Sequence, residues 1–352
     1  MSDFTVEELV VPTSMDQLDA ADFAASVGIM AATELEGYGH DELRMTPAEV
    51  LPIWQDAANP RRLLGVRIDG ALVARAMYEV LLTDAATCWA MVNVLPPFRG
   101  RGIGTAIATH LEELALSQGR SKIISYAIAR EADGERLEAP TGFGSLPLEN
   151  AGVRFLLHRG YTLEQVVRGS RLTLPFEGVL PPVPADYRLH YWTGPVPPEW
   201  REDMVLMHTR MTTDAPTAAL EEPEDVMTVE RLLALEEAYA SSPRTDLTAA
   251  VEHIPSGHLA GFTVLEVPAE SHRAVHQDDT LVLKEHRGHR LGMVLKVANL
   301  LHLERVSPGH TSVLTFNAEE NRFMLDTNEA VGFVPVGYEG AWMKNLSISP
   351  VS

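Results

Sequence analysis

One stretch decides the fold expected of this chain: Val94-Leu-Pro-Pro-Phe-Arg-Gly-Arg-Gly-Ile-Gly104. The apolar run before it, Trp89-Ala-Met-Val-Asn-Val94, predicts a strand, and the run from Thr105 to about Gly119 predicts an amphipathic helix. The glycines let the backbone approach a ligand without Cβ obstruction, and the helix start presents unpaired N–H groups. Strand, glycine-rich turn and helix in this order predict a binding site for a phosphate or pyrophosphate group.

Two better-known phosphate loops do not fit the stretch. A Walker loop needs Lys followed by Ser or Thr after its last glycine, and Thr105-Ala106 does not supply them. A Rossmann fingerprint has the order G-x-G-x-x-G, which differs from the spacing here. The order Val-x-Pro-x-x-Arg-Gly-x-Gly-x-Gly instead resembles the coenzyme-A loop of the GNAT superfamily of N-acetyltransferases. A purely structural glycine turn is the alternative.

The GNAT resemblance implies a role for each residue of the loop. In that family the loop amides bind the coenzyme's pyrophosphate and the preceding strand pairs with its pantetheine arm. The implied pyrophosphate contacts in the first half are Arg99, Gly100, Arg101, Gly102, Ile103 and Gly104, and the implied pantetheine contacts are Val92 and Val94. In the second half, the resemblance implies Val282, Arg287, Gly288, Gly292 and, from a later family motif, Asn321.

The second loop, Glu285-His-Arg-Gly-His-Arg-Leu-Gly292, departs from the family order at one position. Arg290 stands where the middle glycine is expected. Its side chain either crowds the pyrophosphate or pairs with a phosphate oxygen. Crowding would make the second half a degenerate copy.

The second half repeats the order of elements found in the first half, which predicts two copies of one βαβ-containing unit. We expect an N-terminal domain over residues 1–176, a proline-rich linker over 177–184 and a C-terminal domain over 185–352. The fold class expected is α/β (α+β), with two GNAT-like domains in tandem. Each would be a mixed, largely antiparallel sheet flanked by helices.

Among the individual elements, helical spacing predicts a helix over residues 15–37, with Ser14 as its N-cap, and a second helix that opens at Thr46-Pro-Ala-Glu. An Asp69-Gly70 turn is expected between two strands, and a strand is expected over 279–284.

Composition limits the partners. The formal net charge is −21, from 49 acidic and 28 basic residues, which argues against nucleic acid because phosphates demand a basic face. The charge suits a cationic amine, although a solvated acidic surface explains it equally well. The acids near the expected substrate loop of the first half are Glu34, Glu36, Asp41 and Glu42.

The location expected is cytoplasmic. The single cysteine, Cys88, excludes an intramolecular disulfide and suits a reducing compartment. No apolar run of 18 residues occurs, so no membrane contact is expected. The histidines show no metal-ligand spacing, so no metal is expected either. The sequence leaves the oligomeric state open.

The function that follows is transfer of an acyl group, expected to come from acetyl-CoA as co-substrate, to the primary amine of a small molecule. The general-base candidates are Glu79, Glu36 and Asp279. Where many family members carry an acidic tyrosine, this chain has Leu156 and Asn328, which puts the proton donor in doubt. The alternatives are a non-catalytic coenzyme-A-binding module, a tandem protein with one degenerate copy, or a nucleotide-binding protein.

The tandem arrangement also resembles the actinobacterial mycothiol-synthase-like group, in which the C-terminal copy carries the reaction. The intact glycines of the first half favour the N-terminal copy instead. The sequence therefore leaves open which copy is catalytic.

Overall fold

The structure is a computed structural model that describes residues 4–214, 218–220 and 223–346. Within these residues the chain forms two units, each with its own core. Unit 1 contains the residues up to Val167, residues 217–223 and those from Gly337 onward. Unit 2 contains Arg168–Pro216 and Glu224–Val336. The division expected from the sequence, two separately folding domains joined by a linker at 177–184, stays a prediction.

The elements follow one another in the order expected for a repeated βαβ unit. Those of unit 1 are β1 (Val6–Leu9), α1 (Ala20–Tyr38), α2 (Pro47–Trp54), β2 (Arg61–Ile68), β3 (Ala71–Val80), β4 (Thr87–Val94), the 3-10 turn η1 (Pro96–Phe98), α3 (Ile103–Ser117), β5 (Lys122–Ala129), β6 (Arg136–Glu138), β7 (Ser145–Pro147), α4 (Ala151–His158) and η3 (Ala218–Leu220). Those of unit 2 are β9 (Tyr187–Thr193), η2 (Pro198–Trp200), α5 (Arg201–Asp214), α6 (Val229–Tyr239), β10 (Thr245–His253), β11 (His258–Val267), β12 (Val275–Val282), η4 (Lys284–His286), α7 (Leu291–Val306), β13 (Ser312–Ala318) and α8 (Arg322–Val331). Two long strands, β8 (Thr162–Thr173) and β14 (Val334–Asn345), have residues in both units.

Local sequence signals explain several of these boundaries. Thr46 caps α2 as expected: its side chain accepts from the N–H of Glu49, and the Glu49 carboxylate accepts from the N–H of Thr46 at 2.7 Å. Asp69 and Gly70 both have positive φ, 51° and 81°, which forms the expected hairpin turn between β2 and β3.

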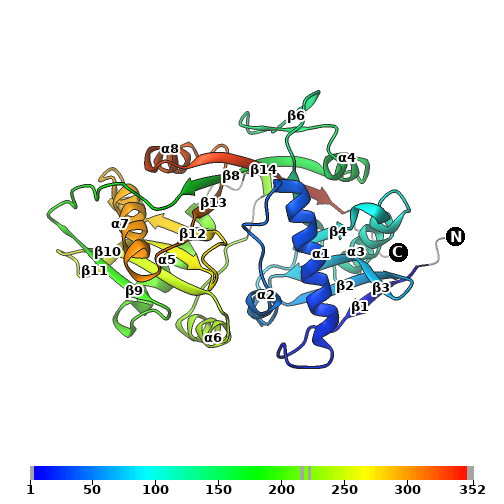
Figure 1. The fold of residues 1–352 in the computed structure, drawn as a ribbon, viewed down its shortest axis with the longest axis horizontal. Helices are drawn as coiled ribbons and strands as arrows, with labels where there is room; N and C mark the ends of the chain where they lie inside the picture. Colours follow the sequence, from blue (N-terminus) through cyan, green and yellow to red (C-terminus); the bar gives the residue numbers. More distant parts are fainter. Residues whose placement is uncertain (1–3, 215–217, 221–222, 347–352) are drawn as a thin grey trace. The chain divides into compact units, whose positions relative to one another are not determined.

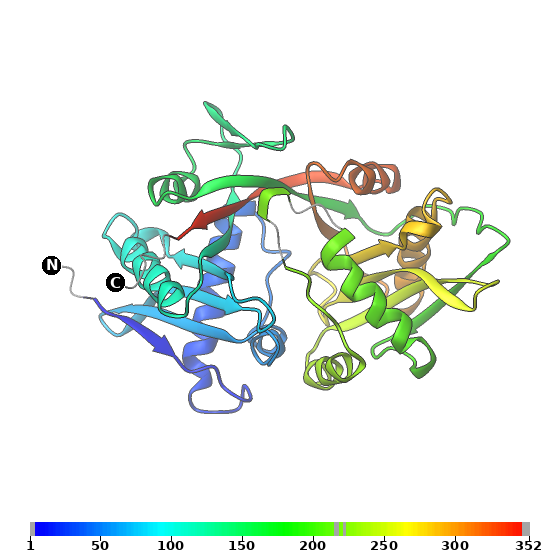
Figure 2. The same cartoon turned by 180° about the vertical axis from the view of Figure 1, so that it is seen from behind.

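The strand order in unit 1 is β1-β2-β3-β4-β5-β14-β8. The pairs β1–β2, β2–β3, β3–β4 and β5–β14 are antiparallel, and β4–β5 is parallel. Helix α1 contacts one face of this sheet and α3 lies against the other (Figures 1 and 2). The order in unit 2 is β8-β13-β12-β11-β10-β9, with β12 and β13 parallel. Helices α5 and α7 lie on opposite faces of that sheet. The expected fold class is confirmed.

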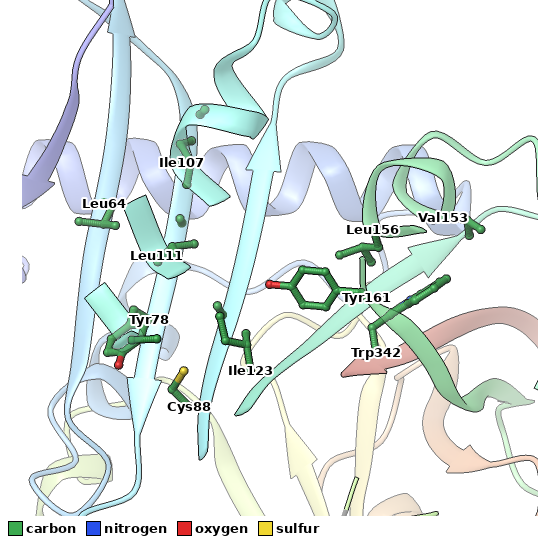
Figure 3. Close-up of a cluster of buried hydrophobic side chains, with 14 of the residues drawn as sticks. Leu64, Tyr78, Cys88, Ile107, Leu111, Ile123, Val153, Leu156, Tyr161 and Trp342 are labelled. Atoms are coloured by element: carbon green, nitrogen blue, oxygen red, sulfur yellow. The ribbon is translucent and has the colours of Figure 1, made fainter. Parts of the chain in front are cut away.

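The last strand of the chain completes the sheet of the first unit. Residues 338–345 of β14 pair antiparallel with the whole of β5. Trp342 of β14 is fully buried in the core cluster that contains Tyr78, Cys88 and Tyr161 (Figure 3). The N-terminal core therefore depends on residues near the C-terminus.

Three boundaries differ from the expectation. Helix α1 begins at Ala20, after Asp19, so the N-cap assigned to Ser14 is wrong. The strand expected over 279–284 is β12, which spans Val275–Val282, and Lys284 belongs to a 3-10 turn. The hydrophilic start of this strand, with His276 and two aspartates, concealed it, because an apolar run is the usual signal.

Among the described residues, no helix is long and apolar enough to cross a membrane.

We expect Trp342→Ala to lower the free energy of unfolding by about 3–5 kcal/mol, because it removes the largest side chain of a closed core. The chain has one cysteine, Cys88, in the same cluster, so its rate of reaction with a thiol reagent reports the opening of unit 1. The variant should react faster than the wild type. The control is Phe262→Ala, which empties a buried position in unit 2. Unchanged Cys88 labelling in Trp342→Ala would contradict this role of β14.

Candidate functional site

The turn between β4 and α3, residues 99–104, is called the glycine turn below. Gly100 and Gly102 have φ of 72° and 86°, a conformation that strains any residue with a Cβ. Gly102 is the N-cap of α3, and its carbonyl accepts the N–H of Ala106 at 3.0 Å. The N–H groups before Ala106 therefore lie at the open end of the helix, where intrahelical partners do not exist.

An arginine holds the glycine turn against the sheet. Nε of Arg99 donates to the carbonyl of Val94 at 2.9 Å. Its guanidinium also donates to both carboxylate oxygens of Glu36, at 2.8 and 2.5 Å. Because Glu36 lies near the end of α1, one side chain joins the strand, the turn and the first helix. A direct contact of the Arg99 side chain with a pyrophosphate stays a prediction.

Unit 2 repeats this arrangement at residues 287–292, the second turn. Arg99 and Arg287 have nearly the same φ and ψ, −70° and 162° against −70° and 161°. Nε of Arg287 donates to the carbonyl of Val282 at 3.1 Å, and its guanidinium pairs with Asp214 at 2.6 Å. Asp214 is the last residue of α5, and Glu36 likewise lies near the end of α1. The two halves therefore share one loop design.

The two turns differ at their middle. A Cβ placed on Gly102 meets no atom within 4 Å, so the space over the glycine turn is open. In the second turn the N-cap of α7 is Arg290, which adopts φ of 58°, uncommon for a residue with a side chain. The backbone of the second turn is thus preserved, while a residue with a side chain, Arg290, stands at the position of Gly102.

The other predicted loop residues have distinct environments. The side chain of Ile103 is buried, so only its backbone can face a ligand. A Cβ on Gly104 would lie 3.4 Å from the ring of Phe155, so glycine lets α3 pack closely there. The guanidinium of Arg101 donates to the carbonyl of Pro97 at 3.2 Å. Backbone N–H groups at a helix start are suited to a phosphate group.

The strand before the glycine turn has a partly unpaired edge. Strands β4 and β5 pair over only three positions, Thr87 with Lys122 through Trp89 with Ile124. Beyond Trp89, β4 continues to pair with β3 as far as Val94. Among the described strands, the β5 side of residues 90–94 is therefore available to an extended ligand. Val92 and Val94 lie in this part, although the Val94 carbonyl already accepts from Arg99.

Strands β12 and β13 separate in the same way, since they pair only at Val275 with Val313 and His276 with Leu314. Val282 and Gly288 lie beyond this point, and a Cβ on Gly292 also meets no atom within 4 Å.

The predicted general bases lie in three separate places. Glu36 is paired with Arg99, and Glu79 of β3 is paired with Arg61 at 2.9 Å. Asp279 lies on β12, with one carboxylate oxygen 3.7 Å from Nδ1 of His208. The two paired glutamates have structural contacts that a free base would not have. Their catalytic assignment stays a prediction.

Asp279 belongs to a β-bulge that the sequence did not reveal. Thr263 pairs with Thr280 and Leu265 with Gln277, so Asp278 and Asp279 together face one residue of β11. Strands β3 and β4 pair without such a shift. Bulges redirect side chains and often lie beside active sites.

A group of charged side chains surrounds this bulge in unit 2. His276 lies 3.1 Å from Glu266, which also lies 3.7 Å from Arg244. Desolvation, followed by the charges of Asp279 and Glu266, raises the pKa of Asp278 to about 8. Because the Asp278 side chain reaches solvent, we attribute its raised pKa mainly to the neighbouring carboxylates.

A second polar group lies under α1 in unit 1. The hydroxyl of Tyr38 donates to the carboxylate of Glu339, a β14 residue beside β5. Burial raises the pKa of Glu34 to about 7, against an opposing effect of Arg75. Burial and the charge of Glu34 raise the pKa of Glu339 to about 7 as well. The sequence indicated Glu34 only as one of several acids. No local pattern connects it with Glu339 on β14, because the two residues lie about 300 positions apart in the chain.

Asn321 caps α8, where its side-chain oxygen accepts from the N–H of Met324 at 3.3 Å. Leu156, at the position of the missing tyrosine, lies in the core of unit 1. Asn328, its counterpart in unit 2, is buried and donates to Asn317 at 2.7 Å. Neither residue supplies an acidic proton.

Unit 2 also contains a pocket of about 570 Å³ between α7, α8 and residues 172–181. Its walls are mostly apolar, with Phe176, Met293 and Val297 among them, and Glu177 is the one carboxylate of the described residues that line it. In the described ranges, no group of three or more His, Cys, Asp or Glu side chains is placed to hold a metal ion.

Comparisons with known proteins agree with this geometry. Residues 30–136 match the acetyltransferase (GNAT) family model. The chain is similar to a tandem GNAT protein from the clavulanic acid biosynthesis pathway, with a TM-score of 0.77, 22% identity, and coverage of 99% of this chain and 100% of that chain. It is also similar to a GCN5-related N-acetyltransferase from Sphaerobacter thermophilus, with a TM-score of 0.64, 18% identity, and coverage of 99% and 96%. Comparison with curated proteins gives no significant match.

The structural neighbours span nearly the whole chain, so both halves share their fold, whereas the family model matches only the part that contains α1 through β5 and the glycine turn. Residues 30–136 thus match the GNAT acetyltransferase family model, and the whole chain has the fold of a tandem GNAT protein.

Proposed function

We propose that this protein transfers an acetyl group from acetyl-CoA to the primary amine of a small molecule, with the coenzyme bound in unit 1. The observation that carries the proposal is the open glycine turn at the start of α3, beside the unpaired edge of β4. Its helix-start N–H groups suit a pyrophosphate. The edge at residues 90–94 suits the amides of a pantetheine arm.

Acetyl-CoA would supply a thioester whose carbonyl carbon accepts the amine. In the balanced reaction a C–N bond forms, the C–S bond breaks, coenzyme A leaves as its thiolate, and the proton lost by the attacking amine ends on that sulfur. We assign the removal of that proton to Glu34, since a carboxylate with a pKa near 7 is half ionised at neutral pH and can both accept and release a proton. Glu36 and Glu79, in contrast, are each held by an arginine.

A second candidate places the reaction in unit 2. The β-bulge at Asp278 and Asp279, next to the point where β12 and β13 separate, favours it. The resemblance to the mycothiol-synthase-like group, which stays part of the proposal, points the same way. Arg290 argues against coenzyme binding there. On balance we assign the coenzyme to unit 1, with unit 2 as the degenerate copy.

A cytoplasmic location stays an expectation that rests on the single cysteine. A chain that bound acetyl-CoA but turned over no amine would instead be a coenzyme-binding module.

The first prediction concerns Gly102→Arg. The new side chain enters the open space over the glycine turn, so the Kd for acetyl-CoA should rise at least about 30-fold, because each lost charge-assisted hydrogen bond costs roughly 1.5–3 kcal/mol. Calorimetric titration measures the change. The matched control is Gly119→Arg, at the other end of α3, where φ is 74° and the space is also open. Equal affinity loss in both variants would mean that backbone strain alone is responsible.

The second prediction concerns the reciprocal change, Arg290→Gly. If Arg290 crowds the second turn, the wild type binds one equivalent of acetyl-CoA and this variant binds two. Calorimetric titration with acetyl-CoA gives the number of equivalents bound by each protein. Two equivalents already bound by the wild type would show that Arg290 accommodates the coenzyme.

The third prediction is a pH dependence. Glu34 acts in its deprotonated form, so kcat/KM should rise as pH increases through about 7 and level off above it. The charged or titratable groups around Glu34 are Arg75 on β3, Glu339 on β14, and Tyr38 on α1. Glu34→Gln should lower kcat/KM about 100-fold and remove this rise.

Glu79→Gln serves as the comparison for the third prediction. Its pairing with Arg61 leads us to expect altered stability and an unchanged pH profile. If Glu79→Gln removes the rise and Glu34→Gln keeps it, the base is misassigned.

A further inference from the structure

Arg75 is a buried cation in the middle of the unit 1 sheet. It lies on β3, opposite Gly65 of β2 and Asn93 of β4, and its exposure is 3%. In the part of the chain that the structure describes, its Nε and Nη1 atoms have no hydrogen-bond partner.

Other arginines of unit 1 with little exposed surface are paired with carboxylates. Arg61 binds Glu79 at 2.9 Å, and Arg159 binds Glu112 at 2.8 Å. A buried charge without a partner destabilises a fold, and proteins rarely retain one. Arg75 is therefore the exception that needs an explanation.

The immediate contacts of Arg75 do not neutralise it. Its guanidinium carbon lies 5.5 Å from the centre of the Trp54 ring, a cation–π contact that holds the group in place. Burial lowers the pKa of Arg75 to about 10, against an opposing effect of Glu34, so it keeps its charge at neutral pH. A positioned, charged guanidinium with two unused N–H groups is suited to a carboxylate.

The opposite charge lies nearby on α1. Asn93, which faces Arg75 across the strands, donates from Nδ2 to the hydroxyl of Thr33 at 3.0 Å. Glu34 follows Thr33 and interacts electrostatically with both Arg75 and Glu339. Glu34 and Glu339 are half-buried, whereas Arg75 is enclosed. The side chains of Arg75, Glu34 and Glu339 thus form a cluster with a cationic inner end and an acidic end that reaches solvent.

We propose that the acceptor is an amino acid, whose carboxylate binds Arg75 and whose amine lies at Glu34 and Glu339. This inference rests on the proposed function and specifies its substrate class. A simple amine would leave Arg75 unpaired, and an inorganic anion would leave the two carboxyl groups without a cation. A molecule with both charges satisfies both ends, and it places the reacting nitrogen beside the base.

The test uses the full-length protein, acetyl-CoA and a panel of common amino acids, each compared with the amine that lacks its carboxylate, such as lysine with cadaverine. Thiol release gives kcat/KM. We expect at least one amino acid to exceed its amine by at least about 30-fold. Arg75→Met should remove this preference by lowering kcat/KM for the amino acid alone, with kcat/KM for the amine unchanged. Arg75→Lys should retain part of the preference.

Arg159→Met is the matched control. Arg159 is a partly enclosed arginine of the same unit, and its partner Glu112 keeps a second cation, Lys344, at 2.9 Å. This variant should keep the preference. If the preference survives Arg75→Met, or if the amines react as well as the amino acids, Arg75 is a structural cation stacked on Trp54 and the inference fails.

A second readout separates this inference from the proposed function. The same amino acids and amines are added without acetyl-CoA, and the Tm is measured for the wild type and Arg75→Met. Stabilisation by an amino acid in the wild type alone, without turnover of any amine, supports the binding site and rejects the acyltransferase. Turnover without carboxylate preference supports the acyltransferase and rejects the site. No Arg75-dependent stabilisation and no turnover reject both.

Discussion

The hydrogen bond from a loop arginine to the last carbonyl of the preceding strand is the interaction on which the site depends. Arg99 and Arg287 each make it, and each then reaches a carboxylate near the end of the first helix of its unit. The contact fixes the direction in which the following helix starts. A helix start is useful for binding an anion only when its N–H groups face open space. The arginine therefore positions the turn through its contacts within the protein, and its contact with a pyrophosphate stays a prediction.

The two units use this shared design differently. In unit 1 the turn is open and the polar groups lie under α1, around Glu34 and Arg75. In unit 2 an arginine stands at the position of the middle glycine, and the strand before the turn carries a bulge and two adjacent aspartates. The turn and the nearby polar side chains thus differ between the two units independently of each other. A duplicated fold allows this divergence because each unit has its own core.

Unit 1 nonetheless obtains essential parts from distant residues. Trp342 fills its core, and Glu339 brings a carboxyl group to α1. Both lie on β14, whose residues from Gly337 onward pair with β5. Strand β8 also passes from one unit to the other, at Val167 and Arg168. The cores are therefore separate, although the covalent segments that build them are interleaved.

The sequence alone determined the repeated order of elements and the glycine turn, because helix and strand periodicity, capping residues and glycine spacing are local signals. Most of the proposed pyrophosphate site follows from such a signal. Tertiary structure alone decided that the part of β14 from Gly337 onward belongs to unit 1, that Glu36 is held by Arg99, and that two nitrogens of Arg75 have no hydrogen-bond partner. These facts concern partners tens to hundreds of residues apart, and no local pattern records which acid meets which arginine. The bulge at Asp278 was hidden for the same reason, since it exists only in the register between two strands.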